Sequence, residues 1–391
     1  MQSAPAHGVR ATCRRFWASD SGGKPPHSKR FATENACAPT RRTVFRHLRT
    51  FRKMIAKKTI LILLVMLAGA RAHSEERTVP QIAELAREVR DKGWIVYGAR
   101  TARGDWDLFN MRPDGSEVRN LTNSPEFNEG LPRFSPDGTR ILYRRIPVGE
   151  RFDNNRHGLQ GQLILASSEG RTVEVFGKDG EFPWASWSPD GSQIVCLFAR
   201  GIEFYDLATK KRVAHLDRQG IFQQLIWSPD GKWLGGVANS FDTGWSVVRM
   251  EVGTGFVNPV SKVDCCTPDW FPDSQTIIYS SRPHEWTQLW RADSEGTKRS
   301  LVYAEEGRHI YGGCTSPDGN YALFTGNKEE DGDPKNAGAP MGLLRLRDTP
   351  MITGLSEAAR KVNRDAKSGP VLTLPPGWEP HWTSAKLEPP K

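Results

Sequence analysis

The sequence has few cysteines, no long apolar run and none of the common catalytic motifs. Six of its 391 residues are cysteines, and the four beyond residue 72 match no zinc-ligand spacing. Gly-x-Ser-x-Gly, His-Glu-x-x-His, a phosphate-binding glycine loop and an EF-hand loop are all missing. These absences argue against a serine peptidase and a zinc protease. For the four later cysteines we predict buried free thiols, with a bond from Cys265 or Cys266 to Cys314 as the alternative.

The excess of positive charge is confined to the start of the chain. The formal net charge is +9, but 15 of the 54 basic residues and only two of the 45 acidic residues lie in residues 1–72. Residues 73–391 therefore carry 39 basic and 43 acidic side chains, a net charge of −4. This mildly acidic segment gives no support for a nucleic-acid partner.

Residues 54–72 are typical of a secretory signal peptide. Two lysines precede a short apolar run over 59–67, and Ala-Arg-Ala at 70–72 supplies a small-x-small cleavage site. The run is shorter than the roughly 20 residues that span a bilayer, so we expect no stable membrane span after cleavage. An uncleaved signal anchor is the alternative. The pattern predicts a periplasmic or secreted protein.

Residues 1–53 fit poorly in front of a signal peptide. They are basic, rich in Pro, Ser and Arg, and show no apolar periodicity. We interpret them as a non-structural upstream segment, with Met54 as the true start of the protein. A basic transit segment or a cytoplasmic tail is the alternative, and under either interpretation these residues are left out of the fold prediction.

A turn motif recurs through the rest of the chain, an aromatic residue followed by Ser-Pro-Asp-Gly. The copies, the last three altered, begin at Phe134, Trp187, Trp227, Trp270, Thr315 and Trp382. The steps between them are 53, 40, 43, 45 and 67 residues. A period of about 44 residues is typical of the four-stranded blades of a β-propeller.

The chemistry of the motif predicts a hairpin turn. Proline presets φ at the first turn position, aspartate accepts hydrogen bonds from nearby amides, and glycine supplies a positive φ. A short apolar or alternating run follows each copy, as expected for a strand. The repeated aspartates therefore have a turn role, and we do not interpret them as a catalytic ring. They are Asp137, Asp190, Asp230, Asp273 and Asp318.

The two ends of the chain supply complementary parts of one blade. Runs at 94–99, 106–110 and 117–121 look like second, third and fourth strands, and 380–383 looks like a first strand on its own. Pairing them completes a ring without free sheet edges. We predict an all-β, six-bladed β-propeller of four-stranded antiparallel blades, closed by pairing of the N- and C-terminal strands.

This fold prediction divides the chain into five parts. They are the upstream segment 1–53, the signal peptide 54–72, a short helix and linker 73–93, the propeller 94–383 and a tail 384–391. Apolar residues at helical spacing, Ile82, Leu85, Ala86 and Val89, predict the short helix. A second helix is predicted over 354–365, in an insertion of the last blade.

The repeat resembles that of TolB-type propellers. The segment from Asp107 to Asn123, Asp-Leu-Phe-Asn-Met-Arg-Pro-Asp-Gly-Ser-Glu-Val-Arg-Asn-Leu-Thr-Asn, is especially similar, because a third strand leads into an Asp-Gly turn and a Leu-Thr ending. The resemblance implies an envelope protein that binds partner proteins through its propeller. We expect no counterpart of the α/β domain that precedes the propeller in TolB, since only about 20 residues separate the predicted signal peptide from the first predicted strand. The repeat is also similar to the propellers of prolyl-oligopeptidase-like proteins and oligogalacturonate lyases.

Propeller geometry indicates where a binding site would lie. Loops that lead into first strands and loops that join second to third strands open on one face, which we call the loop face, and the Ser-Pro-Asp-Gly turns lie on the opposite turn face. The candidate binding residues on the loop face, around the mouth of the central channel, are Glu181, Trp184, His284, Trp286, Arg308, His309 and Tyr311. Trp184 and Trp286 could anchor a peptide or a sugar, or pack between blades.

The sequence favours a binding role over an enzyme. We predict an exported monomeric scaffold that holds a protein or peptide partner in the cell envelope, with no cofactor, no resident metal and no catalytic residue. The first alternative is a metal-assisted carbohydrate-active enzyme, which requires His157, His284 and His309 to converge on one ion. The second is a regulatory propeller that has lost a hydrolase domain.

Overall fold

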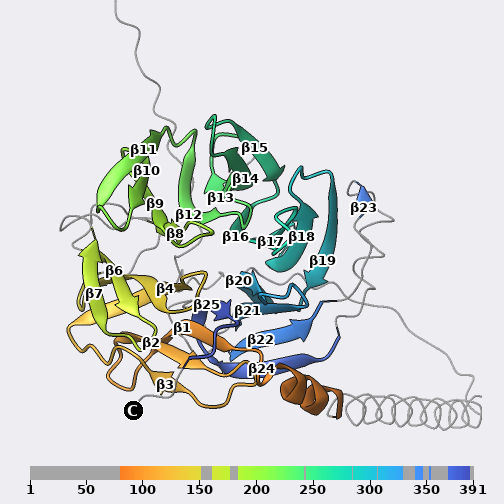
Figure 1. Ribbon diagram of the computed structural model, residues 1–391. Helices are drawn as coiled ribbons and strands as arrows, with labels where there is room; N and C mark the ends of the chain where they lie inside the picture. Colours follow the sequence, from red (N-terminus) through yellow and green to blue (C-terminus); the bar gives the residue numbers. More distant parts are fainter. Residues whose placement is uncertain are drawn as a thin grey trace, which may run out of the picture. The chain divides into compact units, whose positions relative to one another are not determined.

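The strands of the chain form six antiparallel sheets arranged as the blades of a propeller (Figure 1). The computed structural model describes residues 80–150, 161–176, 184–241, 244–283, 285–305, 307–328, 340–346, 352–353 and 369–387. The predicted fold class is therefore confirmed. Among the described residues, no helix is both long and apolar enough to cross a membrane.

Each blade is described from the strand nearest the axis outward. Blade A contains β25 (Trp378–Thr383), β1 (Trp94–Arg100), β2 (Trp106–Met111) and β3 (Arg119–Asn120). Blade B contains β4 (Phe127–Phe134), β5 (Arg140–Pro147), β6 (Gln162–Ser167) and β7 (Thr172–Phe176). Blade C contains β8 (Trp184–Trp187), β9 (Gln193–Phe198), β10 (Gly201–Asp206) and β11 (Lys211–Leu216).

The other three blades complete the ring. Blade D contains β12 (Ile221–Trp227), β13 (Trp233–Ala238), β14 (Ser246–Glu251) and β15 (Val257–Ser261). Blade E contains β16 (Cys265–Trp270), β17 (Thr276–Ser281), β18 (Gln288–Asp293), β19 (Lys298–Tyr303) and a fifth strand, β23 (Ile352–Thr353). Blade F contains β20 (Arg308–Thr315), β21 (Tyr321–Lys328), β22 (Pro340–Arg345) and β24 (Val371–Pro376).

The last strand closes the ring by pairing with the first. Trp94 lies opposite Thr383 and Ile95 lies opposite Trp382 in the antiparallel ladder between β1 and β25. The C-terminal strand is thus the innermost strand of a blade whose other strands come from the N-terminal end, as predicted. We expect this ladder to matter for the stability of the whole ring, because it is where the two ends of the repeat array meet.

The repeated turns have the hydrogen bonds that their residues predict. In four of them the serine hydroxyl donates to the aspartate two residues later, at 2.5–2.6 Å. The glycine that follows has a φ of 70–77°, which an L-residue adopts at a cost. In blade E, Ser274 occupies this position with a φ of 55°, so the altered copy keeps the turn geometry without glycine.

A helix over 80–89 covers the junction between blades A and F. Its predicted apolar face is confirmed, because Leu85 and Val89 belong to one buried cluster with residues of both blades, and Ile82 and Ala86 pack against that cluster. Glu88 adds hydrogen bonds to Tyr321 and Arg345 of blade F. The helix therefore reinforces the ring where the ladder between β1 and β25 closes it.

Several details differ from the sequence-based expectation. The outer strand β3 has only two residues, where a strand over 117–121 is predicted. The insertion between β22 and β24 adds β23 to the edge of the neighbouring blade E through pairs such as Lys298 with Thr353, while the predicted helix over 354–365 lies outside the described residues. The four described cysteines are free, as predicted, but Cys266 is half-buried where a buried thiol is predicted.

Candidate functional site

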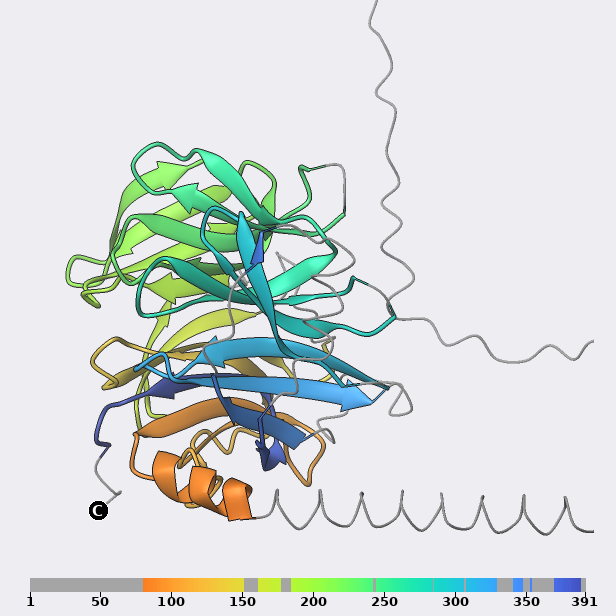
Figure 2. The same ribbon diagram turned by 90° about the vertical axis from the view of Figure 1, so that its right-hand side faces the viewer.

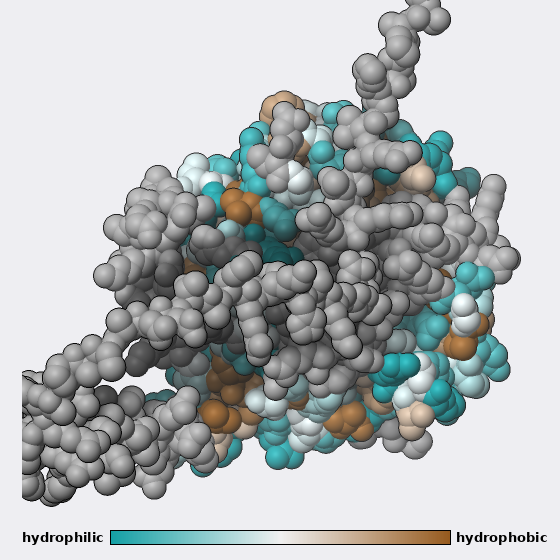
Figure 3. Space-filling model, turned by 180° about the vertical axis from the view of Figure 1, so that it is seen from behind, coloured by the Kyte–Doolittle hydropathy of each residue, from teal (hydrophilic) through white to brown (hydrophobic). Residues whose placement is uncertain are grey.

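The innermost strands run from the loop face to the turn face. The described tail after β25 is dark blue and lies on the left in Figure 2, which is therefore the side of the turn face. Figure 3 shows the loop face, where single brown residues stand among teal ones in the part that grey atoms leave visible. Because each innermost strand runs toward the turn face, a residue several positions before the repeated aromatic position lies near the mouth of the channel. A residue just before that position lies deeper in the channel.

Four half-buried aromatic side chains follow one another across blades E, F and A at this mouth. Trp286 makes an edge contact with His309, with 5.3 Å between the ring centroids. His309 stacks on Tyr311 at 6.0 Å, and Tyr311 lies 6.0 Å from Trp378. We call Trp286, His309, Tyr311 and Trp378 the aromatic row. Its partial exposure leaves aromatic surface for a ligand to cover.

Hydrogen bonds to Thr287 hold the centre of the aromatic row. The backbone N–H of Thr287 donates to Nδ1 of His309 at 3.2 Å, and its hydroxyl lies 3.0 Å from the same atom and 3.2 Å from the Tyr311 hydroxyl. Because a backbone N–H can only donate, Nδ1 is an acceptor and the imidazole is neutral. Burial raises the pKa of Tyr311 to about 12, so the row carries no charge near neutral pH.

The structure brings some of the predicted site residues together and separates others. Trp286, His309 and Tyr311 belong to the aromatic row, and Arg308 lies beside it in an ion pair with Glu305 at 3.0 Å. Trp184 is buried and lines the channel below the mouth. Glu181 and His284 lie outside the described residues.

Trp378 and Thr287 are site residues that the sequence analysis missed. A periodic signal could have found Trp378, because it stands four residues before Trp382, just as Tyr311 stands four residues before Thr315. No comparable signal marks Thr287, whose contact with His309 joins two different blades.

A β-bulge is repeated in five of the six innermost strands. Three residues before the repeated aromatic position, each has a residue with a φ between 49° and 59°: Leu131, Gln224, Thr267, Gly312 and Glu379. In β8 the equivalent residue is Trp184. All six of these residues line one cavity on the propeller axis. One residue of each blade at this offset therefore faces the channel, and in five of the blades it lies in a bulge.

The channel cavity is lined by both charged and apolar groups. Arg133 and Glu379 line it from β4 and β25, and Arg144 joins them from β5. Arg144 is only 2% exposed, and its guanidinium lies over the Trp184 ring at 4.9 Å. Leu225 and Ile226 line the cavity from blade D.

Side chains next to the bulges join neighbouring blades. The hydroxyl of Ser186 accepts a hydrogen bond from the Trp227 N–H at 3.0 Å, and Nδ1 of His381 accepts one from the Phe134 N–H at 3.1 Å. In both pairs, the side chain of the residue that precedes the repeated aromatic position in one blade accepts a hydrogen bond. The donor is the backbone N–H of the residue at the repeated position in the next blade. Burial, with Arg133 acting in the same direction, lowers the pKa of His381 to about 3, so the imidazole remains neutral and keeps this bond.

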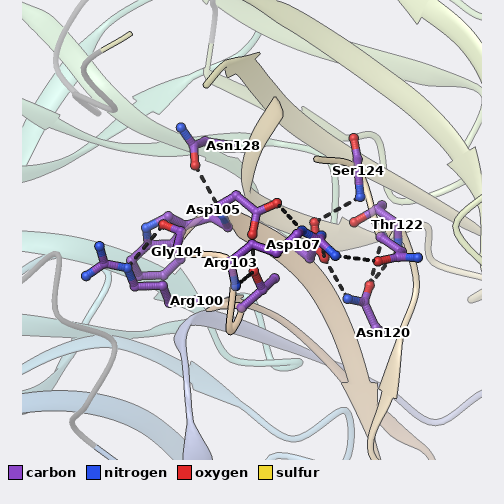
Figure 4. A network of polar contacts seen from close by, with 12 residues as sticks. Arg100, Arg103, Gly104, Asp105, Asp107, Asn120, Thr122, Ser124 and Asn128 are labelled. Atoms are coloured by element: carbon purple, nitrogen blue, oxygen red, sulfur yellow. Dashed lines mark hydrogen bonds and ion pairs between the residues drawn. The ribbon is translucent and has the colours of Figure 1, made fainter. Parts of the chain in front are cut away.

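A second polar network connects blades A and B at the loop face (Figure 4). Arg103 pairs with Asp105 at 3.0 Å and with the fully buried Asp107 at 3.1 Å, and Asp107 also accepts the Ser124 N–H at 3.1 Å. Burial raises the pKa of the nearby Glu129 to about 7, and the charge of Asp107 acts in the same direction. These internal partners indicate a structural role in holding the connection between β3 and β4.

The metal site required by the enzyme alternative stays untested. His157 and His284 lie outside the described residues, so their distance from His309 is undefined. Within the described ranges, no three His, Cys, Asp or Glu side chains are grouped closely enough to hold a metal ion.

Comparison with known proteins agrees with the fold. TolB from Acinetobacter baumannii is similar with a TM-score of 0.54 and 19% identity, over 75% of this chain and 67% of that one. The chain has a TolB-like propeller fold. A putative TolB from Agrobacterium tumefaciens gives a TM-score of 0.46 and 17% identity, over 67% of this chain and 87% of that one.

Sequence relatives add no specific activity to this TolB-like propeller. An uncharacterized protein of Agrobacterium fabrum is 27% identical over 211 residues, which are 44% of this chain and 69% of that protein. No protein-family model matches the chain. The similarity to solved structures, at these identities, concerns the fold.

Proposed function

We propose that this TolB-like propeller is an exported scaffold that binds a protein or peptide partner at the mouth of its channel. The observation that supports the proposal is the aromatic row, in which four half-buried rings span three neighbouring blades. Partly exposed Trp and Tyr side chains held by their neighbours are the residues that most often dominate protein interfaces. The row is uncharged, so an apolar or aromatic side chain of the partner is its natural complement.

Capture of partners by variants of the full chain tests this site. The chain is used to recover cross-linked partners from a cell-envelope extract, alongside Trp286→Ala and Trp378→Ala. Truncating an interface anchor costs about 2 kcal/mol or more, which is roughly a thirtyfold loss of affinity. Phe256→Ala is the matched control, because Phe256 is 63% exposed and lies in the turn between β14 and β15, on the turn face. Partner recovery that both Trp variants leave unchanged would contradict the proposal.

The proposed export rests on residues 54–72, and it is tested separately. If the signal peptide is cleaved after Ala72, N-terminal sequencing of the protein from its native cell begins near His73. A product that begins at residue 1 would contradict both the proposed cleavage and the proposed start at Met54.

A further inference from the structure

The channel cavity begins directly below the aromatic row. Tyr311 of the row is followed by Gly312, and Trp378 is followed by Glu379, and both of these following residues line the cavity. A ligand that covers the row therefore has its inner end one residue away from the cavity. What the cavity accepts is decided by its charge and its size.

Two arginines give the cavity a positive side. Arg144 is buried against Trp184, and Nη1 of Arg133 donates to the carbonyl oxygens of Pro132 at 3.0 Å and Glu379 at 3.4 Å. A guanidinium stays protonated at all working pH values and presents a planar fork of donors. Glu379 is the single carboxyl group among the residues that line the cavity.

Glu379 offsets the two arginines only in part. Burial raises the pKa of Glu379 to about 7, although Arg133 and Arg144 both act to lower it. Near neutral pH the two arginines therefore face a fraction of one negative charge on Glu379 and most of one on the adjacent Asp269, which interacts with Arg133 and whose pKa burial raises to about 6, so a positive excess remains. The rest of the lining is mainly apolar, including Leu142, Leu163 and Leu225, and such surroundings strengthen the attraction between the guanidinium groups and an anion.

The volume of the cavity limits the size of that anion. The cavity measures about 30 Å³, and one water molecule needs roughly 10–15 Å³ on the same measure. The space therefore corresponds to two or three water molecules, which is the size of a carboxylate group and small for a tetrahedral anion. A carboxylate is also the planar partner that matches the arginine fork.

We propose that the channel cavity is a carboxylate-binding subsite, in which Arg144 and Arg133 receive the two oxygens of the incoming group. The carboxylate belongs either to a free small acid or to the partner chain, as an acidic side chain or a C-terminus held by the aromatic row. Binding of a carboxylate of the partner chain rests on the proposed function, whereas binding of a free small acid requires no partner.

Thermal unfolding of the full chain tests the subsite with defined probes. Sodium acetate is compared with sodium chloride at equal ionic strength and with acetamide, the neutral analogue of acetate. A ligand that binds only the folded state raises the midpoint by an amount that gives its affinity. We expect a rise with acetate alone, and an affinity at least tenfold weaker in Arg144→Gln. In case that variant fails to fold, Arg144→Lys keeps the charge, removes the fork and should also weaken binding.

Arg145→Gln is the matched control. Arg145 is adjacent to Arg144 on β5, but its guanidinium lies over Phe127 at 4.3 Å and bonds to Gln162, so the acetate effect should be retained. An equal rise with acetate and chloride would overturn the proposal, as would an acetate effect that both Arg144 variants keep.

Two tripeptides distinguish the sources of the carboxylate. Ala-Ala-Trp with a free C-terminus is compared with its amide. If the tripeptide with a free C-terminus binds at least tenfold more tightly than acetate, and Trp378→Ala removes that gain, the carboxylate comes from the partner chain. If this tripeptide and acetate bind with equal affinity, the subsite is assigned to free acids. Loss of partner capture in the Trp variants with an intact acetate effect separates the two proposals, because the subsite and the partner site then respond independently.

Discussion

Replacing Trp382 with alanine tests the closure of the ring. Trp382 is 4% exposed, its ring lies 5.9 Å from that of Tyr321, and its Nε1 donates to the Lys92 carbonyl at 2.8 Å. It packs in the cluster that contains Leu85 of the helix. A buried Trp-to-Ala change costs about 3–5 kcal/mol, and the carbonyl that loses its donor adds roughly 1 kcal/mol. We expect a loss of about 4–6 kcal/mol in the free energy of unfolding.

Trp227→Ala is the comparison that makes this magnitude informative. Trp227 occupies the same repeat position but is half-buried, and its Nε1 donates to Gly231 in the turn of its own blade at 2.9 Å. Because part of its side chain is already exposed, its loss should cost roughly 2–3 kcal/mol. Urea unfolding of both variants gives the two losses in free energy of unfolding, provided that m, the slope of this free energy against urea concentration, equals that of the unmodified protein. Equal costs would refute the argument that the ladder between β1 and β25 is the critical junction.

Three further changes test other parts of the fold. Leu85→Ala removes a side chain that is 2% exposed, so urea unfolding should show a loss of about 2–4 kcal/mol; a loss under 1 kcal/mol would mean that the helix does not belong to the propeller. Arg103→Ala removes the cation that pairs with the buried Asp105 and Asp107, so it should cost more stability than Arg171→Ala. Arg171→Ala, at a pair that is 82% exposed on the arginine side, should cost under about 0.5 kcal/mol. Because burial raises the pKa of Glu379 from 4.5 to about 7, its contribution to stability is present below pH 4.5 and is lost as pH rises through 7. Glu379→Gln should therefore show a smaller fall in stability over that pH range, and parallel pH profiles of the two proteins would contradict this.

The blades were predictable from the sequence because their turns are local. Ser-Pro-Asp-Gly contains the hydroxyl, the acceptor and the positive-φ residue that one hairpin needs, and the structure shows the expected bonds in each intact copy. The ring closure was predictable for a related reason. Three strands without a first strand at one end, and a first strand alone at the other, leave one pairing that completes a blade.

The channel was not predictable by the same reasoning, because its lining is assembled from all six blades, with six residues from blade B and no more than three from any other. Leu131 and Gln224 are ordinary strand residues in the sequence, and the structure places them in bulges that line the channel. A signal exists in hindsight, since Leu131, Thr267 and Glu379 each precede a proline and stand three residues before the repeated aromatic position. Trp184 has the same offset, which accounts for its position in the channel rather than on the loop face.

The repeated bulge gives the channel residues the same backbone conformation without fixing the chemistry of their side chains. Leu131, Gln224, Thr267 and Glu379 share one unusual backbone conformation although their side chains are apolar, polar and acidic. A left-handed residue of this kind carries a conformational cost for any L-residue, so the surrounding ladder, and not the side chain, must stabilise it. The side chains are consequently free to differ from blade to blade without loss of the ring. Both cavity arginines lie on blade B, and this placement is a choice of side chains that the fold does not require.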